Sequence, residues 1–258
     1  MRVLVIGCGS IGSRRARLLA EMGHAVTGID IADSLADALT AGPAAAFVCT
    51  PADTHYEIAS ACAAAGVPTF IEKPLCASWA DLARFSALPL RSDRQVNVAC
   101  NMRYAYNGFP ASSMLHLESS QPLKDWRPGA EVTYRAHGIV LESAIHELDL
   151  IRYWLGPIAR AEIVGTADRV LIGTTHRDGG TASIRCDWGE NAEGERFVLS
   201  IGYGRTLWPD TSDQMYRREM VDWLDAVKRD SMPVNSLARA LEVTAWALRL
   251  RDQLEVAI

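Results

Sequence analysis

A glycine pattern close to the start of the chain constrains its fold more than any other feature. The aliphatic run at residues 3–6 is typical of a strand buried on both faces, and it leads directly into Gly7-Cys8-Gly9-Ser10-Ile11-Gly12. A helical stretch follows. This order of strand, G-x-G-x-x-G and helix predicts a nucleotide-binding βαβ unit, with a pyrophosphate at the helix N-terminus. The residues expected to hold it are Gly7, Gly9, Ser10, Ile11 and Gly12.

An acid at the end of the second expected strand indicates which nucleotide is bound. That strand covers residues 24–29 and ends at Asp30, 18 residues beyond Gly12. A carboxylate there accepts hydrogen bonds from both ribose hydroxyls of an adenosine and repels a 2′-phosphate. Ile31 and Ala32 follow, so no adjacent arginine is present to bind NADP. We therefore predict NAD as the cofactor, with NADP the less favoured alternative.

Strands and helices continue to alternate up to about residue 100. Further strands are expected at 44–49, 68–71 and 95–100, with helices at 53–65 and 78–87. Repeated βα units predict a doubly wound parallel sheet, in which ligands bind at the carboxyl ends of the strands. The residues that follow those ends are Thr50, Pro51, Glu72, Lys73, Pro74, Asn101, Arg103 and Tyr104.

Four segments within the first 104 residues carry a resemblance to a known family. Residues 50–55 read T-P-A-D-T-H, Ala65-Gly66 follows, and residues 72–74 read E-K-P. This order resembles the glucose–fructose oxidoreductase, inositol dehydrogenase and MocA family, which has T-P-x-x-x-H, A-G and E-K-P at similar intervals. Asn101-Met102-Arg103-Tyr104 is similar to the family's next segment. The resemblance implies that Thr50, Pro51, His55, Glu72, Lys73 and Asn101 contact the cofactor.

A second group of polar residues lies on a helix expected at residues 142–155, which Gly156-Pro157 ends. At about 100° per residue, Glu142, His146 and Asp149 lie within about 60° of one another. The family has a catalytic histidine in the pattern D-x-x-x-H-x-x-D, so the resemblance implies that His146 is catalytic, with Glu142 in place of the first aspartate. From the residues alone, a solvated face of paired charges remains the alternative.

The rest of the chain predicts a second domain. Strands without intervening helices are expected at 160–166, 169–174, 182–187 and 196–202, followed by helices at 214–228 and 237–254. We expect an α/β plus α+β fold: an NAD-binding Rossmann domain over residues 1–104, and a smaller substrate-binding and catalytic domain on an open, largely antiparallel sheet over residues 105–258. By analogy with the family, the open sheet predicts a homo-oligomer, a dimer or a tetramer.

Composition argues against several other functions. The net charge of −5 gives no general attraction to nucleic acid or to anionic membranes. No apolar run approaches the ~20 residues of a spanning helix, and we expect no secretory signal before the glycine motif. The six cysteines are scattered, which suits reduced thiols in a cytoplasm. We expect no metal, because His146-Glu147 is followed by Leu150 where a zinc motif needs a second histidine.

The resemblance implies hydride transfer between the nicotinamide and a secondary alcohol or ketone of a sugar, cyclitol or sugar derivative. His146 is expected to take the hydroxyl proton, since an imidazole with a pKa of about 6.5 suits a base at neutral pH. Lys73 is expected to stabilise the developing alkoxide, and Glu142 and Asp149 to orient His146 or bind neighbouring hydroxyls. The expected substrate-binding residues are Lys73, Arg103, Tyr104, Glu142 and His146.

Two other functions stay open at this point. Some relatives use a bound cofactor as an internal redox partner, or reduce unrelated substrates. The second alternative is a non-catalytic NAD-binding sensor, for which the small second domain and Glu142 are the argument. For Lys73 taken alone, an ordinary surface lysine remains the alternative. The joint presence of Lys73 and His146 disfavours a sensor, because a sensor needs neither residue.

Overall fold

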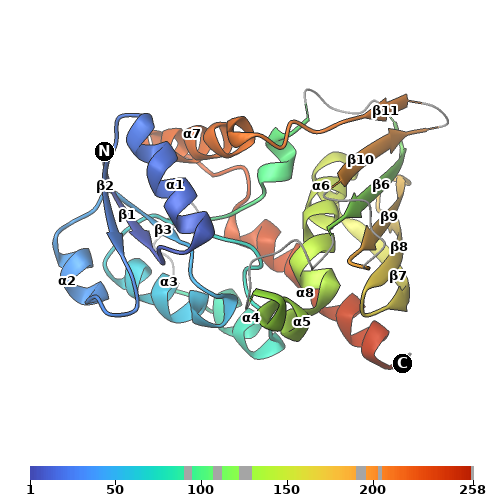
Figure 1. Ribbon diagram of the computed structural model, residues 1–258, viewed down its shortest axis with the longest axis horizontal. Helices are drawn as coiled ribbons and strands as arrows, with labels where there is room; N and C mark the ends of the chain where they lie inside the picture. Colours follow the sequence, from blue (N-terminus) through green and yellow to red (C-terminus); the bar gives the residue numbers. More distant parts are fainter. Residues whose placement is uncertain (90–94, 107–111, 122–129, 190–195, 203–204, 257–258) are drawn as a thin grey trace. The chain divides into compact units, whose positions relative to one another are not determined.

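The computed structural model describes residues 1–89, 95–106, 112–121, 130–189, 196–202 and 205–256. The chain divides into two compact units (Figure 1). The first unit consists of Met1–Asn101 and Ser212–Glu242, and the second of Met102–Thr211 and Val243–Ile258. The chain therefore passes between the two units three times.

The first unit is built on a parallel sheet of five strands in the order β2-β1-β3-β4-β5. The strands are β1 (Arg2–Ile6), β2 (Ala25–Ile29), β3 (Ala45–Val48), β4 (Thr69–Ile71) and β5 (Val96–Val98). The connecting helices are α1 (Ser10–Glu21), α2 (Leu35–Thr40), the 3₁₀ turn η1 (Ala52–Thr54), α3 (His55–Ala64) and α4 (Trp79–Ser86). The predicted doubly wound sheet is confirmed, and its topological switch point lies between β1 and β3, where such sheets bind ligands.

Local sequence explains most of these elements. Every residue of β3 and β4 is buried, as expected for parallel strands covered on both faces. Helix α4 begins after Ser78, which caps it, because its hydroxyl accepts a hydrogen bond from the backbone N–H of Asp81 at 3.0 Å. Helix α2 was not predicted. It has six residues and buries none of them, so it has no apolar periodicity to detect.

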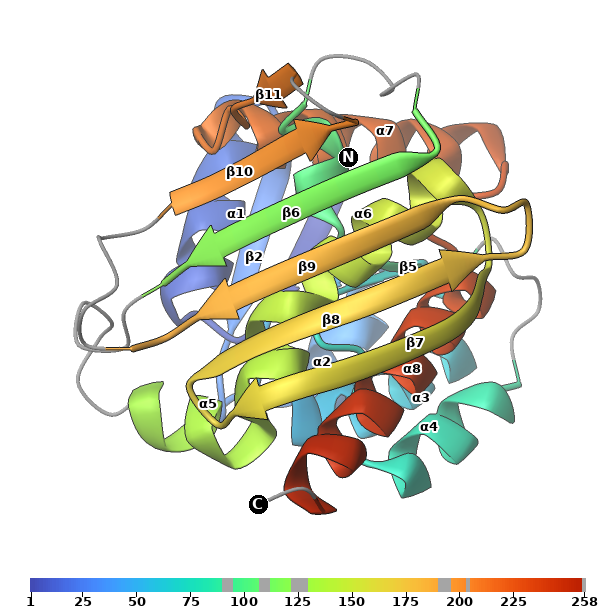
Figure 2. The ribbon, with the colours of Figure 1, turned by 90° about the vertical axis from the view of Figure 1, so that its right-hand side faces the viewer.

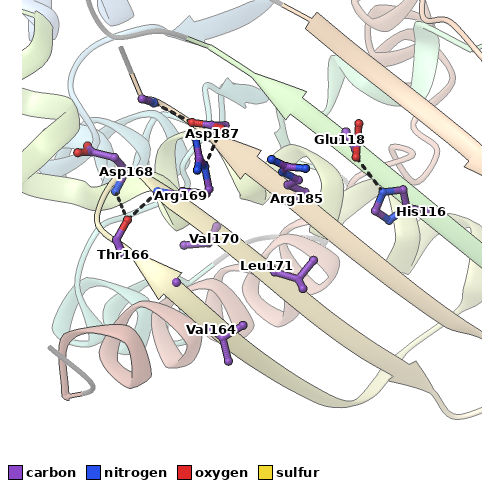
Figure 3. Close-up of a pocket in the computed structure, with 12 residues that line it drawn as sticks. His116, Glu118, Val164, Thr166, Asp168, Arg169, Val170, Leu171, Arg185 and Asp187 are labelled. Carbon is purple, nitrogen blue, oxygen red and sulfur yellow. Dashed lines mark hydrogen bonds and ion pairs between the residues drawn. The ribbon is translucent and has the colours of Figure 1, made fainter. Parts of the chain in front are cut away.

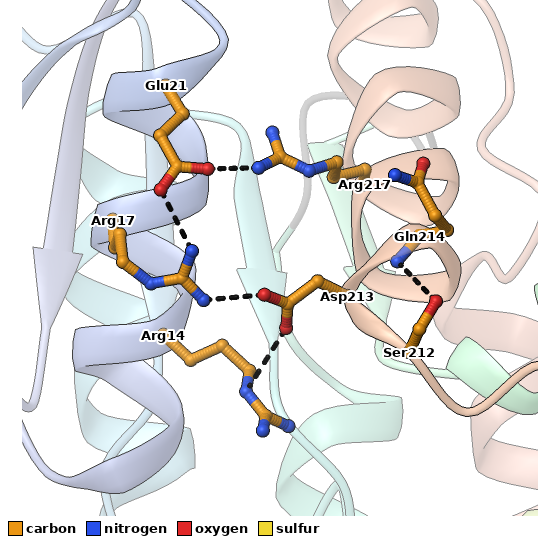
Figure 4. Close-up of polar contacts among 7 residues, drawn as sticks. All are labelled: Arg14, Arg17, Glu21, Ser212, Asp213, Gln214 and Arg217. Carbon is orange, nitrogen blue, oxygen red and sulfur yellow. Dashed lines mark hydrogen bonds and ion pairs between the residues drawn. The ribbon is translucent and has the colours of Figure 1, made fainter.

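Helix α7 (Asp213–Arg229) returns to the first unit from far along the chain. Its Trp223 packs edge-on against Phe47 of β3, with ring centroids 4.9 Å apart, and against Phe70 of β4 at 5.4 Å. Ion pairs also join α7 to α1, among them Arg17 to Asp213 at 2.6 Å (Figure 4). Aromatic burial on the sheet and charge pairing at the surface thus hold this helix in place.

The return of α7 changes the expected domain limits of 1–104 and 105–258. The first break falls after Asn101, close to the expected one, but Ser212–Glu242 lies with the first unit. The helix was predicted correctly as a helix. The sequence does not show which element α7 packs on, because an amphipathic pattern indicates that one face of a helix is buried but not which element covers that face.

The second unit is built on a six-stranded sheet in the order β11-β10-β6-β9-β8-β7 (Figure 2). The strands are β6 (Met114–Ser120), β7 (Ile158–Thr166), β8 (Arg169–His176), β9 (Thr181–Asp187), β10 (Arg196–Ile201) and β11 (Arg205–Leu207). Neighbouring strands are antiparallel except β6 and β9, so the predicted open, largely antiparallel sheet is confirmed. Exposed and buried residues alternate along β8, so one face of the sheet is packed and the other, which Figure 2 views, is exposed.

The helical segments of this unit are α5 (Ala130–Ile139), the π-helical turn η5 (Val140–Ala144), α6 (Ile145–Leu155) and the part of α8 (Leu237–Val256) from Val243 onward. Both η5 and α6 pack against β9. Neither α5 nor β6 was predicted. No helix in the described part of the chain combines the length and apolarity needed to cross a bilayer.

Candidate functional site

The loop between β1 and α1 has the conformation that its glycines permit. Gly7 has a φ of +89°, and a Cβ there would lie 2.8 Å from Cγ2 of Thr50. A Cβ on Gly12 would lie 1.8 Å from the carbonyl oxygen of Gly7, so neither position accepts a side chain. A Cβ on Gly9 would meet nothing within 4 Å, which leaves the backbone there open to a ligand. These are the three glycine roles of a dinucleotide-binding loop.

The start of α1 suits an anion. Gly9 is the N-cap residue of α1, and no side chain accepts a hydrogen bond from the N-terminal N–H groups of this described helix. The first turn of α1 contains no acidic residue. The first backbone N–H groups of a helix have no intrahelical acceptor, so they attract a phosphate. Ser10 is exposed and Ile11 is half-buried beside this end. Exposed Asp30 lies close by, because its Oδ2 accepts a hydrogen bond from the backbone N–H of Cys8 at 3.3 Å. The residues present therefore fit the adenosine and pyrophosphate of NAD.

The loops after β3 and β4 are joined by His55. Its Nε2 lies 2.8 Å from the carbonyl oxygen of Thr50, and its Nδ1 lies 3.1 Å from that of Pro74 and 3.2 Å from that of Leu75. The residue is 1% exposed, and burial lowers its pKa although the carbonyl groups oppose that effect. We interpret His55 as the link between two strand ends, one of which carries half-buried Lys73 in a Lys73–Pro74 cis peptide.

The carboxylate of Glu72 faces α1. Its Oε1 accepts a hydrogen bond from Nε of Arg15 at 2.8 Å and lies 2.7 Å from Nη2 of the same arginine. Arg15 is fully buried and pairs with a second acid, Glu219 of α7, at 2.8 Å. Like the imidazole of His55, the carboxylate of Glu72 therefore binds other groups of the protein. Burial and pairing of both side chains favour positioning roles over the direct cofactor contact that the resemblance implies.

The remaining strand-end residues differ in exposure. Pro51 is exposed, Thr50 and Tyr104 are half-buried, and Asn101 is 8% exposed. Oδ1 of Asn101 is buried and has no hydrogen-bond partner within the described part of the chain. A buried acceptor of this kind is costly unless a ligand or water satisfies it. This orphaned oxygen fits an N–H or O–H donor of a bound molecule.

In the second unit, Arg103 and Asp149 form a buried, two-pronged ion pair. Nε of Arg103 donates to Oδ2 of Asp149 at 2.7 Å, and Nη2 donates to Oδ1 at 2.5 Å. The guanidinium also lies over the ring of Tyr153, 4.5 Å from its centroid. This pair joins the 3₁₀ turn η3 (Asn101–Tyr104) to α6. Asp149 thus orients Arg103, in addition to any effect on His146, its neighbour on α6.

The helix over 142–155 was predicted as a continuous α-helix, and the structure corrects this. Residues 140–144 form a π-helical turn, so the angle of 100° per residue does not relate Glu142 to His146. Glu142 instead accepts a hydrogen bond from Nδ1 of His137 at 2.7 Å, across the kink at Gly138, whose φ is +81°. π-Helical turns are frequent at functional sites.

His146 itself is half-buried on α6. It borders a narrow crevice with Glu147 of the same helix and with residues of β6 and β10, among them Glu118 and Val198. Glu147 is 3% exposed and raises the pKa of Tyr106, after the larger effect of burial. The imidazole therefore shares this crevice with two carboxylates of the second unit, Glu118 and Glu147.

Sequence reasoning missed Arg15, Glu219 and His137. Arg15 lies three residues before Leu18 on the buried stripe of α1, and Glu219 lies four residues before Trp223 on that of α7. A charged residue within an apolar stripe was the available signal, because such a residue must find a partner inside. His137 gave no comparable signal before the kink at Gly138 was known.

The exposed face of the second sheet carries an open hollow of about 680 Å³ (Figure 3). A row of residues in register crosses it from β7 to β6: Val164, Leu171, Arg185 and Glu118. Val164 is 65% exposed and Leu171 is 46% exposed. None of the predicted site residues lines this hollow. Within the described residues, no cluster of histidine, cysteine and acidic side chains could hold a metal ion.

Comparison with known proteins agrees with this geometry. Residues 20–100 match the model of the GFO_IDH_MocA oxidoreductase family, described as an NAD-binding Rossmann fold. The chain is 28% identical over 189 residues to myo-inositol 2-dehydrogenase of Thermotoga maritima, an alignment that covers 60% of this chain and 55% of that protein. The chain thus matches about half the length of this relative.

Solved structures extend the likeness of fold to the whole chain. UDP-N-acetylglucosamine 3-dehydrogenase from Acidithiobacillus ferrooxidans superposes with a TM-score of 0.83 at 20% identity, over 99% of this chain and 98% of that one. Myo-inositol 2-dehydrogenase from Lactobacillus plantarum gives a TM-score of 0.79 at 16% identity, over 100% and 98%. Residues 20–100 match this family model, and the segments at 50–55 and 72–74 follow its pattern, so this part of the chain is similar to the glucose–fructose oxidoreductase, inositol dehydrogenase and MocA (Gfo/Idh/MocA) oxidoreductases, with an NAD-binding Rossmann fold.

Proposed function

We propose that this protein is an NAD-dependent oxidoreductase that transfers hydride between the nicotinamide and a secondary alcohol or ketone of a sugar, cyclitol or sugar derivative. The observation that carries the proposal is the glycine loop at the switch point of the sheet, after β1, with Lys73 after the end of β4, which lies two strands away in the same sheet. The named activities of the relatives, on myo-inositol and on UDP-N-acetylglucosamine, support the same substrate class.

The roles of the residues follow from their chemistry. When bound, NAD supplies a nicotinamide ring that exchanges a hydride with the carbinol carbon. His146 takes the hydroxyl proton in the oxidative direction, because an imidazole is a base near neutral pH. The ammonium of Lys73 hydrogen-bonds the same oxygen and stabilises its developing negative charge. Arg103 and Tyr104 line the substrate pocket in this proposal, with Arg103 held in one orientation by Asp149.

Glu142 takes the place that the family pattern gives to aspartate. We propose that its contact with His137 fixes the longer carboxylate, so that it binds a substrate hydroxyl beside His146. Gly7, Gly9, Ser10, Ile11 and Gly12 hold the pyrophosphate, and Asp30 holds the adenosine ribose. Thr50, Pro51 and Asn101 contact the remainder of the cofactor, while His55 and Glu72 support them from within.

A homo-oligomer, dimer or tetramer, forms part of the proposal. The exposed face of the second sheet supports it, because two aliphatic side chains and an opposite-charge pair lie in one row across four strands. A two-fold axis would place the same surface of a second copy on this face. The six cysteines form no disulfide, which supports a cytoplasmic setting.

The test combines a substrate panel with one substitution. Purified protein is mixed with NAD and with myo-inositol, simple sugars or UDP-N-acetylglucosamine, and NADH absorbance is followed. Lys73→Met should lower the turnover of any active substrate by about 10²- to 10³-fold, while the Kd for NAD changes less than about threefold. Lys228→Met, which removes an exposed lysine of α7, is the control and should leave turnover unchanged.

The outcomes separate the alternatives. Absence of NADH formation with every panel member contradicts a dehydrogenase that uses free NAD. A change in the spectrum of tightly bound cofactor, without net NADH, indicates the internal redox partner instead. Binding of NAD with no redox change at all indicates a sensor. Near-normal turnover of the Lys73→Met variant contradicts the role given to Lys73.

A further inference from the structure

The interior of the first unit contains a charged cluster that the proposed reaction does not use directly. Arg15 is fully buried, its guanidinium lies over the ring of Phe70 at 4.6 Å from the centroid, and it touches two carboxylates. Glu72 lies 2.7 Å from Nη2 and Glu219 lies 2.8 Å from Nη1. These three residues come from α1, from the end of β4 and from α7.

Glu219 uses its two oxygens on different partners. Oε2 pairs with Arg15, and Oε1 accepts a hydrogen bond from the backbone N–H of Cys100 at 2.5 Å. Cys100 follows β5 and precedes Asn101, while Glu72 follows β4 and precedes Lys73. The cluster therefore holds the carboxyl ends of two adjacent strands, one residue away from two residues of the candidate site.

A cluster of this kind is a poor source of stability. Removing three charges from water costs several kcal/mol per ion, and well-packed apolar residues often serve as well or better. Burial accordingly raises the pKa of Glu219, against the opposing effect of Arg15. The cluster supplies what apolar packing does not. Nε of Arg15 donates a directional hydrogen bond to Glu72, and Nη1 and Nη2 form short ion pairs with Glu219 and Glu72, so one guanidinium holds two carboxylates close together.

We propose that Arg15 and Glu219 are positioning residues, which hold the ends of β4 and β5 so that Lys73 and Asn101 keep one fixed spacing for the cofactor and the substrate hydroxyl. This inference rests on the proposed function. Lys73 is held from both sides, because Arg15 fixes Glu72 before it and His55 binds the carbonyl oxygen of Pro74 after it.

Substitution of Glu219 is the direct test. Glu219→Ala leaves the Arg15–Glu72 pair balanced in charge but removes the acceptor of the Cys100 N–H. Glu219→Gln retains an oxygen for that N–H and removes the charge. In the full-length protein, we expect Glu219→Ala to lower kcat by about 100-fold, with KM and the Kd for NAD within about threefold. Glu219→Gln should restore most of the lost kcat. Asp225→Asn changes an acid in an exposed ion pair of the same helix, so it is the matched control and should have the same kcat as the parent.

A second readout does not depend on activity. The chain has three lysines, Lys73, Lys124 and Lys228, so reductive ¹³C-methylation gives few NMR signals, and Lys73→Met assigns one of them. The Lys73 signal should be a single sharp line in the parent and in Glu219→Gln, and broadened or split in Glu219→Ala. If the parent oxidises no panel member, the proposed function fails while this measurement still decides the positioning role.

Arg15→Lys provides a second variant should Glu219→Ala unfold at the assay temperature. A lysine keeps the positive charge but cannot bridge both carboxylates with a planar group, so the same loss of kcat and the same broadening are expected. Folded Glu219→Ala and Arg15→Lys variants with a parent-like kcat and a parent-like Lys73 signal would overturn the proposal.

Discussion

At the scale of single residues, Gly9 and Gly12 show why two glycines of one motif are required for different reasons. Gly9 has a φ of −66°, which any residue adopts, and open space where a Cβ would be. A methyl group there leaves the fold intact but occupies the space of the pyrophosphate. A methyl group on Gly12 would overlap the carbonyl oxygen of Gly7, so the loop itself must move.

This contrast predicts opposite phenotypes. The free energy of unfolding of Gly9→Ala in urea should lie within about 1 kcal/mol of that of the parent, while its affinity for NADH should be at least about tenfold weaker. Gly12→Ala should lose about 2–4 kcal/mol of stability. Urea unfolding and NADH fluorescence titration measure the two effects. Equal NADH affinity of Gly9→Ala and the parent would contradict the placement of the pyrophosphate.

The motif residues were also those that could be predicted from sequence. Gly7, Gly12 and Asp30 act through backbone geometry and spacing within one βαβ unit, which local sequence determines. Arg15 and Glu219 could not be paired in advance, because their partnership depends on how α1 and α7 pack on the same sheet.

At the scale of elements, His55 links the loops after β3 and β4, and its lowered pKa predicts that these loops lose stability in acid. The reference pKa of a histidine is 6.5, and burial lowers the pKa of His55 in the folded protein. Below about pH 6.5 the unfolded chain therefore binds the proton more readily than the folded one. Folded stability should fall as the pH decreases through this range, with a slope that approaches about 1.4 kcal/mol per pH unit from this group.

Comparison of two variants measures that contribution. The urea midpoint of the parent should decrease between pH 7.5 and pH 5.5 more steeply than that of His55→Asn, which has no titrating ring. His116→Asn, on the exposed sheet face of the other unit, is the control and should retain the parent's slope. Identical slopes for the parent and His55→Asn would show that this histidine keeps an ordinary pKa.

Elements with strong local patterns were predicted well, and those without them were not. The strands and helices of residues 2–100 were expected at nearly their observed limits, apart from α2. Strand β6 buries Leu115, Leu117 and Ser119, which is too weak an alternation to stand out from sequence. Its place between β9 and β10 depends on pairing with strands far along the chain. The π-helical turn at 140–144 was also invisible, since it inserts a residue into an otherwise helical pattern.

At the scale of the whole molecule, the exposed sheet face of the second unit should be buried between copies of the chain. Leu171→Lys would place a charge within the aliphatic part of the row, so it should shift the species seen by light scattering toward the monomer. Val221→Lys, an equally exposed position on α7, is the matched control and should leave the mass unchanged. A parent protein that is monomeric at micromolar concentration would contradict the proposed assembly.

The sequence by itself determined the nucleotide-binding unit, its preference for NAD and the general form of both sheets, because these depend on glycine positions, one acid and hydrophobic periodicity along short stretches. Tertiary structure decided the partners of the charged residues. It joined Arg15 to Glu72 and Glu219, Arg103 to Asp149, and Glu142 to His137. Burial makes such partners necessary, but only packing between distant segments determines which residues meet.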